Sequence, residues 1–161
     1  DALEDAKAML DLALQRFGKV DQLVVASGMN KPGFIHELDY EDWQAVIDHM
    51  TRAIEERPWD DDAHNLMGFA YRKLGDYDQA LKQYDRALAL NPHHRGALEY
   101  LGEAYLELDR PELAKGMLDR LVVECQRINV SATSGGWQAS CEEWQDLNEA
   151  YEAYVAGDNR E

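Results

Sequence analysis

The stretch that decides the fold is DDAHNLMGFAYRKLGDYDQALKQYDRALALNPHH, residues 61–94. When it is shifted by its own length, a second copy follows at once, and six positions are identical in the two copies. The identical pairs are Ala63/Ala97, Gly68/Gly102, Ala70/Ala104, Tyr71/Tyr105, Leu74/Leu108 and Ala80/Ala114. When the stretch is shifted by the same length toward the N-terminus, only its second half meets similar residues, so half a repeat lies upstream. A period of about 34 residues, with small residues where helices cross, is typical of a helix-turn-helix solenoid unit.

The hydrophobic pattern within the stretch predicts two helices. Apolar residues between Ala63 and Leu74 recur at spacings of three and four, which places them on one helical face. Gly75 can adopt the left-handed conformation that ends a helix, and Asp76 is a suitable N-cap for the next. We expect the second helix to run over 77–90 and to end before Pro92, because proline disfavours helix in the residue before it.

Residues at fixed places in both copies resemble those of the tetratricopeptide repeat family. The first copy carries this likeness in Leu66, Met67, Gly68, Tyr71, Ala80, Tyr84, Ala87 and Pro92, and the second in Gly102, Tyr105 and Ala114. The resemblance covers Tyr40–Gln126, with a half repeat at 40–60 and repeats at 61–94 and 95–126. It implies a mainly α fold, an antiparallel helix-pair solenoid in which Tyr71, Tyr84 and Tyr105 serve core packing.

The flanks differ from the repeats. Residues 1–39 combine a helical stripe over Ala2–Phe17 with Val20–Ala26, a β-branched segment that predicts a strand or a buried extended segment. After a paired helix at Pro111–Glu124, the Ser/Gly-rich stretch 127–139 predicts a linker or strand. A capping helix is expected at 140–156, starting with a capping box of Ser140 and Glu143. Such a helix would cover the apolar end of the solenoid.

A second, fragmentary resemblance is to the short-chain dehydrogenase/reductase family. Phe17–Asp48 resembles that family's fourth strand, the turn after it and the following helix, and Arg127–Gly135 resembles its next strand. The family's glycine-rich dinucleotide loop has no counterpart, Ala132 stands at the place of the catalytic serine, and Val155 stands where lysine should follow Tyr151. The resemblance is therefore architectural. It implies a two-stranded parallel β element from 20–26 and 127–132, and the alternative is that both segments are extended loops.

Composition bounds the possible partners. The 161 residues carry a net charge of −16, which argues against binding to nucleic acid or to an anionic membrane. No segment approaches the ~20 consecutive apolar residues of a membrane span. We therefore expect a soluble protein, cytoplasmic or periplasmic, whose partner is a protein or peptide.

No metal or cofactor site is expected. The five histidines show no ligand spacing with Cys, Asp or Glu. Asp60, Asp61 and Asp62 lack the alternating ligands and the glycine of a calcium loop, and a helix N-terminus explains these acids. No carboxylate is paired with a recognisable nucleophile, so no catalytic residue is assigned.

Cys125 and Cys141 are the only cysteines. A disulfide between them would clamp the last helix onto the solenoid in an oxidising compartment. Two buried free thiols are the alternative.

The resemblance to tetratricopeptide repeats also implies a concave groove, lined by the first helix of each pair, that takes peptides. On that ground the first repeat would contribute Asn65, Phe69, Arg72 and Lys73, and the second Glu99, Glu103, Leu106 and Glu107. The spacing of four between the three glutamates keeps them on one helical face. The alternative is an ordinary solvated helix face.

Three hypotheses on function follow. The first is a non-catalytic interaction module that binds a partner protein or peptide. Self-association or docking is expected to cover the remaining apolar edge, because two and a half repeats bury less apolar surface than the usual minimum of about three. The second is a degenerate nucleotide-binding fragment of dehydrogenase type. The third is a mosaic chain, natural or engineered, with a structural role and self-association.

Overall fold

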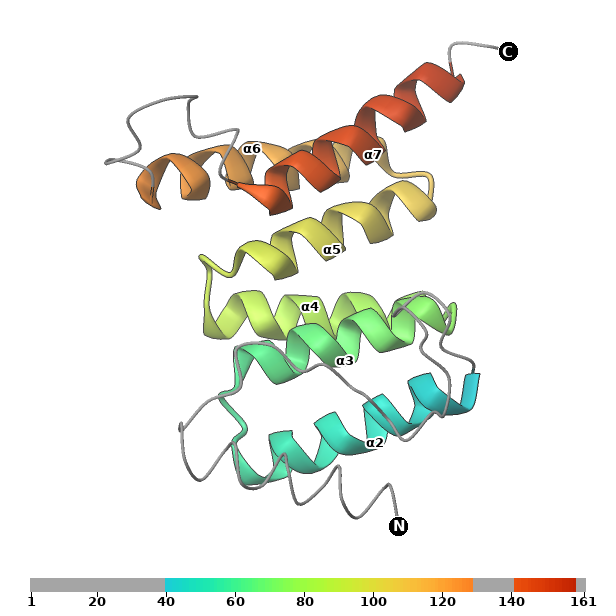
Figure 1. Cartoon of the computed structure of the whole chain (residues 1–161), viewed down its shortest axis with the longest axis vertical. Helices are drawn as coiled ribbons and strands as arrows, with labels where there is room; N and C mark the ends of the chain where they lie inside the picture. The colour runs from blue at the N-terminus through green and yellow to red at the C-terminus, as the bar shows by residue number, and fades with distance from the viewer. Residues whose placement is uncertain (1–39, 129–140, 159–161) are drawn as a thin grey trace.

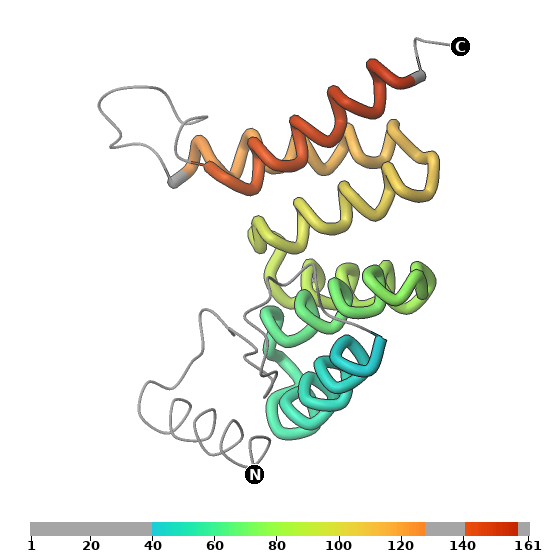
Figure 2. The backbone as a smooth tube through the Cα atoms, turned by 45° about the vertical axis from the view of Figure 1, so that its right-hand side comes forward, coloured from blue at the N-terminus to red at the C-terminus, as the bar shows by residue number. Residues whose placement is uncertain are grey.

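The computed structural model describes residues 40–128 and 141–158, which form helices and, within those ranges, no strand. Each helix runs antiparallel to the one before it, so the chain builds a stack of helices from α2 at one end to α6 and α7 at the other (Figure 1, Figure 2). The helices are α2 (Tyr40–Glu56), α3 (Asp61–Lys73), α4 (Tyr77–Leu90), α5 (Arg95–Glu107), α6 (Pro111–Ile128) and α7 (Glu142–Asp158). This mainly helical, solenoid-like architecture confirms the predicted fold class.

Side-chain N-caps start the helices α3, α4 and α5. Asp60 accepts a hydrogen bond from the Ala63 amide at 3.0 Å, and Asp76 accepts one from the Gln79 amide at 3.2 Å. These bonds satisfy backbone donors that have no partner within the first turn of a helix. The caps therefore fix where α3 and α4 begin.

The cap of α5 is a histidine ring. Nδ1 of His94 accepts from the Ala97 amide at 3.2 Å, and Nε2 lies 3.1 Å from the Asp62 carboxylate. Since Nδ1 accepts, the ring proton is on Nε2, the nitrogen that lies near Asp62. His94 thereby joins the start of α5 to the start of α3.

Both repeat units end their first helix in the same way. Gly75 has φ +77°, and the following amide of Asp76 donates to the Tyr71 carbonyl at 2.9 Å. Asp109, at the equivalent place of the second repeat, has φ +59°, and the Arg110 amide donates to the Tyr105 carbonyl at 2.8 Å. Each is a left-handed C-terminal cap of Schellman type, which turns the chain sharply into the next helix.

The core divides into two clusters. One lies between α2 and α3, and the other extends through α4, α5, α6 and α7. Tyr71 packs against both, and Tyr84 is fully buried. Gly68 allows the close approach of α3 to α4, because a Cβ added there would lie 2.7 Å from Cε1 of Tyr84. The predicted structural role of the small residues at helix crossings therefore has a direct geometric basis.

The helix α7 closes the stack as a cap. It packs on α5 and α6, and its fully buried Leu147 lies against Gly102. In addition, a disulfide joins Cys125 of α6 to Cys141, the residue before α7, with Cα atoms 5.9 Å apart. Both cysteines are fully buried. The end of the solenoid is therefore covered by a helix that is also tethered covalently.

Some expectations for the flanks need correction or fall outside the described residues. The helix α6 continues to Ile128, so the strand predicted from 127 cannot begin there, and the small β element is not supported. The expected helix end at Glu124 was wrong because neither glycine nor proline follows it to stop α6. The predictions for 1–39, for Ser140 and for the remainder of 127–139 lie outside the described ranges.

Candidate functional site

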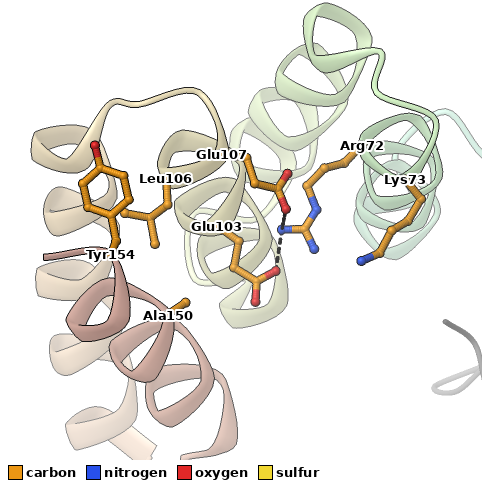
Figure 3. A pocket seen from close by; sticks show the side chains of 7 residues that line it. All are labelled: Arg72, Lys73, Glu103, Leu106, Glu107, Ala150 and Tyr154. Atoms are coloured by element: carbon orange, nitrogen blue, oxygen red, sulfur yellow. Dashed lines mark ion pairs between the residues drawn. The ribbon is translucent and has the colours of Figure 1, made fainter. Parts of the chain in front are cut away.

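A hollow of about 390 Å³ lies where α3, α5 and α7 face one another (Figure 3). The helices α3 and α5 each begin an antiparallel pair, and α7 follows the second pair, so the three run in the same direction (Figure 1). The residues that line the hollow are Arg72, Lys73, Glu103, Leu106, Glu107, Ala150 and Tyr154. Five of them belong to the eight groove residues predicted from the sequence. We refer to this hollow as the α3/α5/α7 groove.

Arg72 is the central cation of the α3/α5/α7 groove. Its side chain is buried, and its Nη1 atom lies within ion-pair distance of Glu103 and 3.8 Å from Glu107 (Figure 3). The guanidinium carbon lies 5.3 Å from the Phe69 ring centre and 5.6 Å from that of Tyr100. Burial lowers the pKa of Arg72, but the two carboxylates raise it and outweigh burial. Arg72 is thus a permanently charged tie between α3 and α5.

Phe69 serves packing more than it lines the groove. Its ring lies 5.5 Å from Trp43 of α2 and 4.8 Å from Tyr100 of α5, measured between centroids. Edge and tilted ring contacts of this kind stabilise helix packing. Lys73 is exposed, and its ammonium nitrogen lies 5.0 Å from the Phe69 ring centre. Lys73 is therefore the cation at the rim.

Glu99 lies one helical turn before Glu103 on α5, beside the α3/α5/α7 groove but not among the residues that line it. Its side chain is only 8% exposed. Burial raises the pKa of the Glu99 carboxyl to about 8, and the neighbouring Glu103, Asp146 and Glu143 raise it further, whereas Arg72 acts in the opposite direction. No cation of the described residues lies within ion-pair distance of it. A buried carboxyl without a counter-charge is costly to ionise.

Asn65 lies on α3 where this helix packs against α5. It is 7% exposed, and its amide nitrogen approaches Gly96 of α5 so closely that a Cβ there would lie 3.3 Å away. Gly96 and Glu99 are three residues apart on α5 and so share a helical face. The side-chain oxygen of Asn65 is buried and has no hydrogen-bond partner among the described residues. The Asn65 oxygen therefore lacks a donor near Glu99, while Nε and Nη1 of the neighbouring Arg72 are also buried without a hydrogen-bond partner among the described residues.

The helix α7 supplies the third wall. Tyr154 donates its hydroxyl to Asp109 in the turn after α5, and Glu143 pairs with Arg95 at 3.2 Å. These contacts hold both ends of α7 against α5. Ala150 and Tyr154 were absent from the sequence-based groove residues, because an apolar stripe shows that a helix packs without showing which helix it crosses.

The acidic run at the start of α3 is occupied by structural contacts. The carboxylates of Asp60, Asp61 and Asp62 lie close together. Asp60 caps α3 and pairs with Arg57 at 2.9 Å, Asp61 accepts from Asn91 at 2.6 Å, and Asp62 contacts His94. The run therefore ties the turns of the first repeat together, which agrees with its interpretation as a helix start.

Comparisons with known proteins agree with the repeat architecture. Models described as tetratricopeptide repeat match residues 61–94 and residues 97–124. These ranges contain α3 and α4 and most of α5 and α6. No helix among the described residues is long and apolar enough to cross a membrane.

A partial similarity to oxidoreductases accompanies the repeats. An uncharacterized oxidoreductase of Mycobacterium tuberculosis is 44% identical over 52 residues, which is 32% of this chain and 19% of that protein. Glucose 1-dehydrogenase 2 of Bacillus subtilis is 48% identical over 46 residues, 28% of this chain and 18% of that protein. The chain thus spans less than a fifth of the length of these curated relatives. The similarity agrees with the fragmentary resemblance noted in the sequence.

Proposed function

We propose that this chain, in which residues 61–94 and 97–124 are tetratricopeptide repeats, is a non-catalytic module that binds a segment of a partner protein in the α3/α5/α7 groove. The observation that carries the proposal is the groove itself. Both repeats contribute their first helix to it, and α7 adds a third wall, so its lining combines charged, aliphatic and aromatic side chains. Such a mixture suits a peptide, whose recognition needs both apolar anchors and polar orientation.

The rigidity of the walls supports the same function. Arg72 ties α3 to α5, the Tyr154 hydroxyl ties α7 to the turn after α5, and Arg95 ties α5 to α7. A preformed groove loses little conformational entropy when a ligand binds, which favours affinity. The second helix of each pair, α4 or α6, lies on the other side of the pair from the groove. Its exposed face therefore serves as a control surface for binding experiments.

Photo-crosslinking tests the proposal with two matched positions. Lys73 lies at the groove rim on α3, and Lys82 is exposed on α4. A photoreactive amino acid at either position replaces the same residue type on neighbouring helices. In cells that express the full chain, we expect position 73 to give a discrete adduct, and position 82 to give none. Adducts of equal yield from both positions, or from position 82 alone, would overturn the proposal.

A further inference from the structure

The residues in and beside the α3/α5/α7 groove carry an unbalanced set of charges. Five carboxylates belong to this region, and three cations accompany them. The carboxylates are those of Glu99, Glu103, Glu107, Glu143 and Asp146, and the cations are those of Arg72, Lys73 and Arg95. Arg72 is engaged by Glu103 and Glu107, and Arg95 by Glu143. The carboxylate left buried without a cation is that of Glu99.

The charged and phenolic neighbours of Glu99 come from α3, α5 and α7. Arg72 of α3 faces it, as do Tyr100 and Glu103 of its own helix and Glu143 and Asp146 of α7. Four of these five groups are acidic or phenolic, and the single cation already serves another carboxylate. The surroundings therefore disfavour the ionised form of Glu99, and Arg72, which pairs with Glu103 and Glu107, offsets this only in part.

A second observation at the same crossing points to a missing donor. The Asn65 side-chain oxygen is buried and has no partner among the described residues. Buried polar groups are hydrogen-bonded in the great majority of cases, and an unsatisfied acceptor costs about 1–3 kcal/mol. Once Glu99 is ionised, it and the Asn65 oxygen are both acceptors, and one donor-rich cationic group could satisfy both.

We infer that a partner segment bound in the α3/α5/α7 groove inserts a lysine or arginine side chain beside Glu103, where its cationic head pairs with the adjacent Glu99. This inference rests on the proposed function, because it specifies what the groove recognises. Lysine offers three donors and arginine five, and neither accepts a hydrogen bond, which matches two acceptors without donors. The surplus of negative charge around the groove also attracts a basic segment before contact.

Pairing of the inserted cation with Glu99 releases a proton from this carboxyl, so binding depends on pH. With a pKa of about 8, Glu99 is mostly protonated at pH 7 in the free protein. A cation placed beside it stabilises the carboxylate and expels that proton, so about 0.9 proton is released per bound segment at pH 7. Affinity rises as the pH rises from 6 toward 8, by up to about tenfold per pH unit, and levels off above 8.

A display experiment with random twelve-residue peptides tests the inference on the full chain. Peptides are selected on immobilised wild-type protein at pH 8, and their affinities are then measured for Glu99→Gln and for Glu112→Gln. Glu112 is exposed on α6, so its substitution removes the same charge away from the groove. We expect the selected peptides to share a basic residue, and Glu99→Gln to weaken them about 30-fold or more, while Glu112→Gln leaves the affinity within about twofold.

Calorimetry provides a second measurement. Titrations at pH 7 in phosphate and in Tris, whose ionisation enthalpies differ, report the number of protons released. Wild type should release about 0.9 proton per peptide and Glu99→Gln close to none. Selected peptides without a shared basic residue, or equal proton release by both proteins, would overturn the inference and leave the groove itself intact.

A further pair of variants separates this failure from a failure of the proposed function. Lys73→Trp fills the rim of the groove, and Lys82→Trp places the same side chain on α4. If Lys73→Trp abolishes peptide binding and Lys82→Trp does not, peptides occupy the groove. If only Lys82→Trp weakens binding, the peptides bind elsewhere and both proposals fall.

Discussion

Replacing Glu99 by glutamine should stabilise the protein, and the gain should grow with pH. A folded-state pKa of about 8 against an ordinary value of 4.5 means that the unfolded chain gives up this proton first as the pH rises. The free energy of unfolding of wild type therefore falls between pH 4.5 and 8, and the loss is complete above pH 8. Glutamine has nearly the same shape and no charge, so it removes this cost.

The magnitude follows from the pKa difference. At about 1.4 kcal/mol for each pH unit, the ionised carboxylate costs about 5 kcal/mol above pH 8, about 3 kcal/mol at pH 7 and less than about 1 kcal/mol at pH 5. We expect these values to be upper bounds on the gain from Glu99→Gln, because water and side chains rearrange around a buried charge. The gain in the free energy of unfolding should therefore increase from pH 5 to pH 9.

Urea unfolding followed by circular dichroism at pH 5, 7 and 9 measures the effect. Glu112→Gln is the matched control and should change the free energy of unfolding by no more than about 0.5 kcal/mol at each pH. The reasoning is refuted if Glu99→Gln is no more stable than wild type at pH 9. It is equally refuted if the gain is the same at pH 5 as at pH 9.

Two further predictions concern packing and the cap. Gly68→Ala would push a methyl group against the Tyr84 ring and should destabilise the protein by about 1–3 kcal/mol in urea unfolding. The control Gly116→Ala adds a methyl group in open space on α6 and should stabilise the protein by up to about 1 kcal/mol. Equal effects of the two would contradict the close crossing. Replacing Cys141 by serine should lower the free energy of unfolding by about 3 kcal/mol, because the bond to Cys125 spans 16 positions. An identical melting temperature with and without reductant would exclude a stabilising disulfide.

Much of the repeat architecture could be predicted because its signals are local. The helix α4 begins and ends where hydrophobic periodicity and turn residues placed it, at 77–90. Gly75 and Asp76 take the capping roles that their side chains favour. The left-handed Asp109 was not predicted, since an aspartate in that conformation is uncommon, although its place one repeat after Gly75 was a usable signal.

The site was harder to predict because it depends on contacts between distant helices. The family resemblance named Arg72 as a groove residue, but its burial results from Glu103 and Glu107, which lie in the next repeat. The contribution of Tyr154 depends on how α7 crosses α5, which no local pattern specifies. Likewise, the spacing of the glutamates placed Glu99 on the right face without revealing that it would be buried.

The measurement that tests the central claim most directly is a backbone NMR titration of the full chain with a peptide selected on it. If the α3/α5/α7 groove is the binding surface, the largest chemical-shift changes will fall on Lys73, Glu103, Glu107 and Tyr154, with little change on the outer faces of α4 and α6. Changes concentrated on α4 and α6, with the groove residues unmoved, would contradict the account.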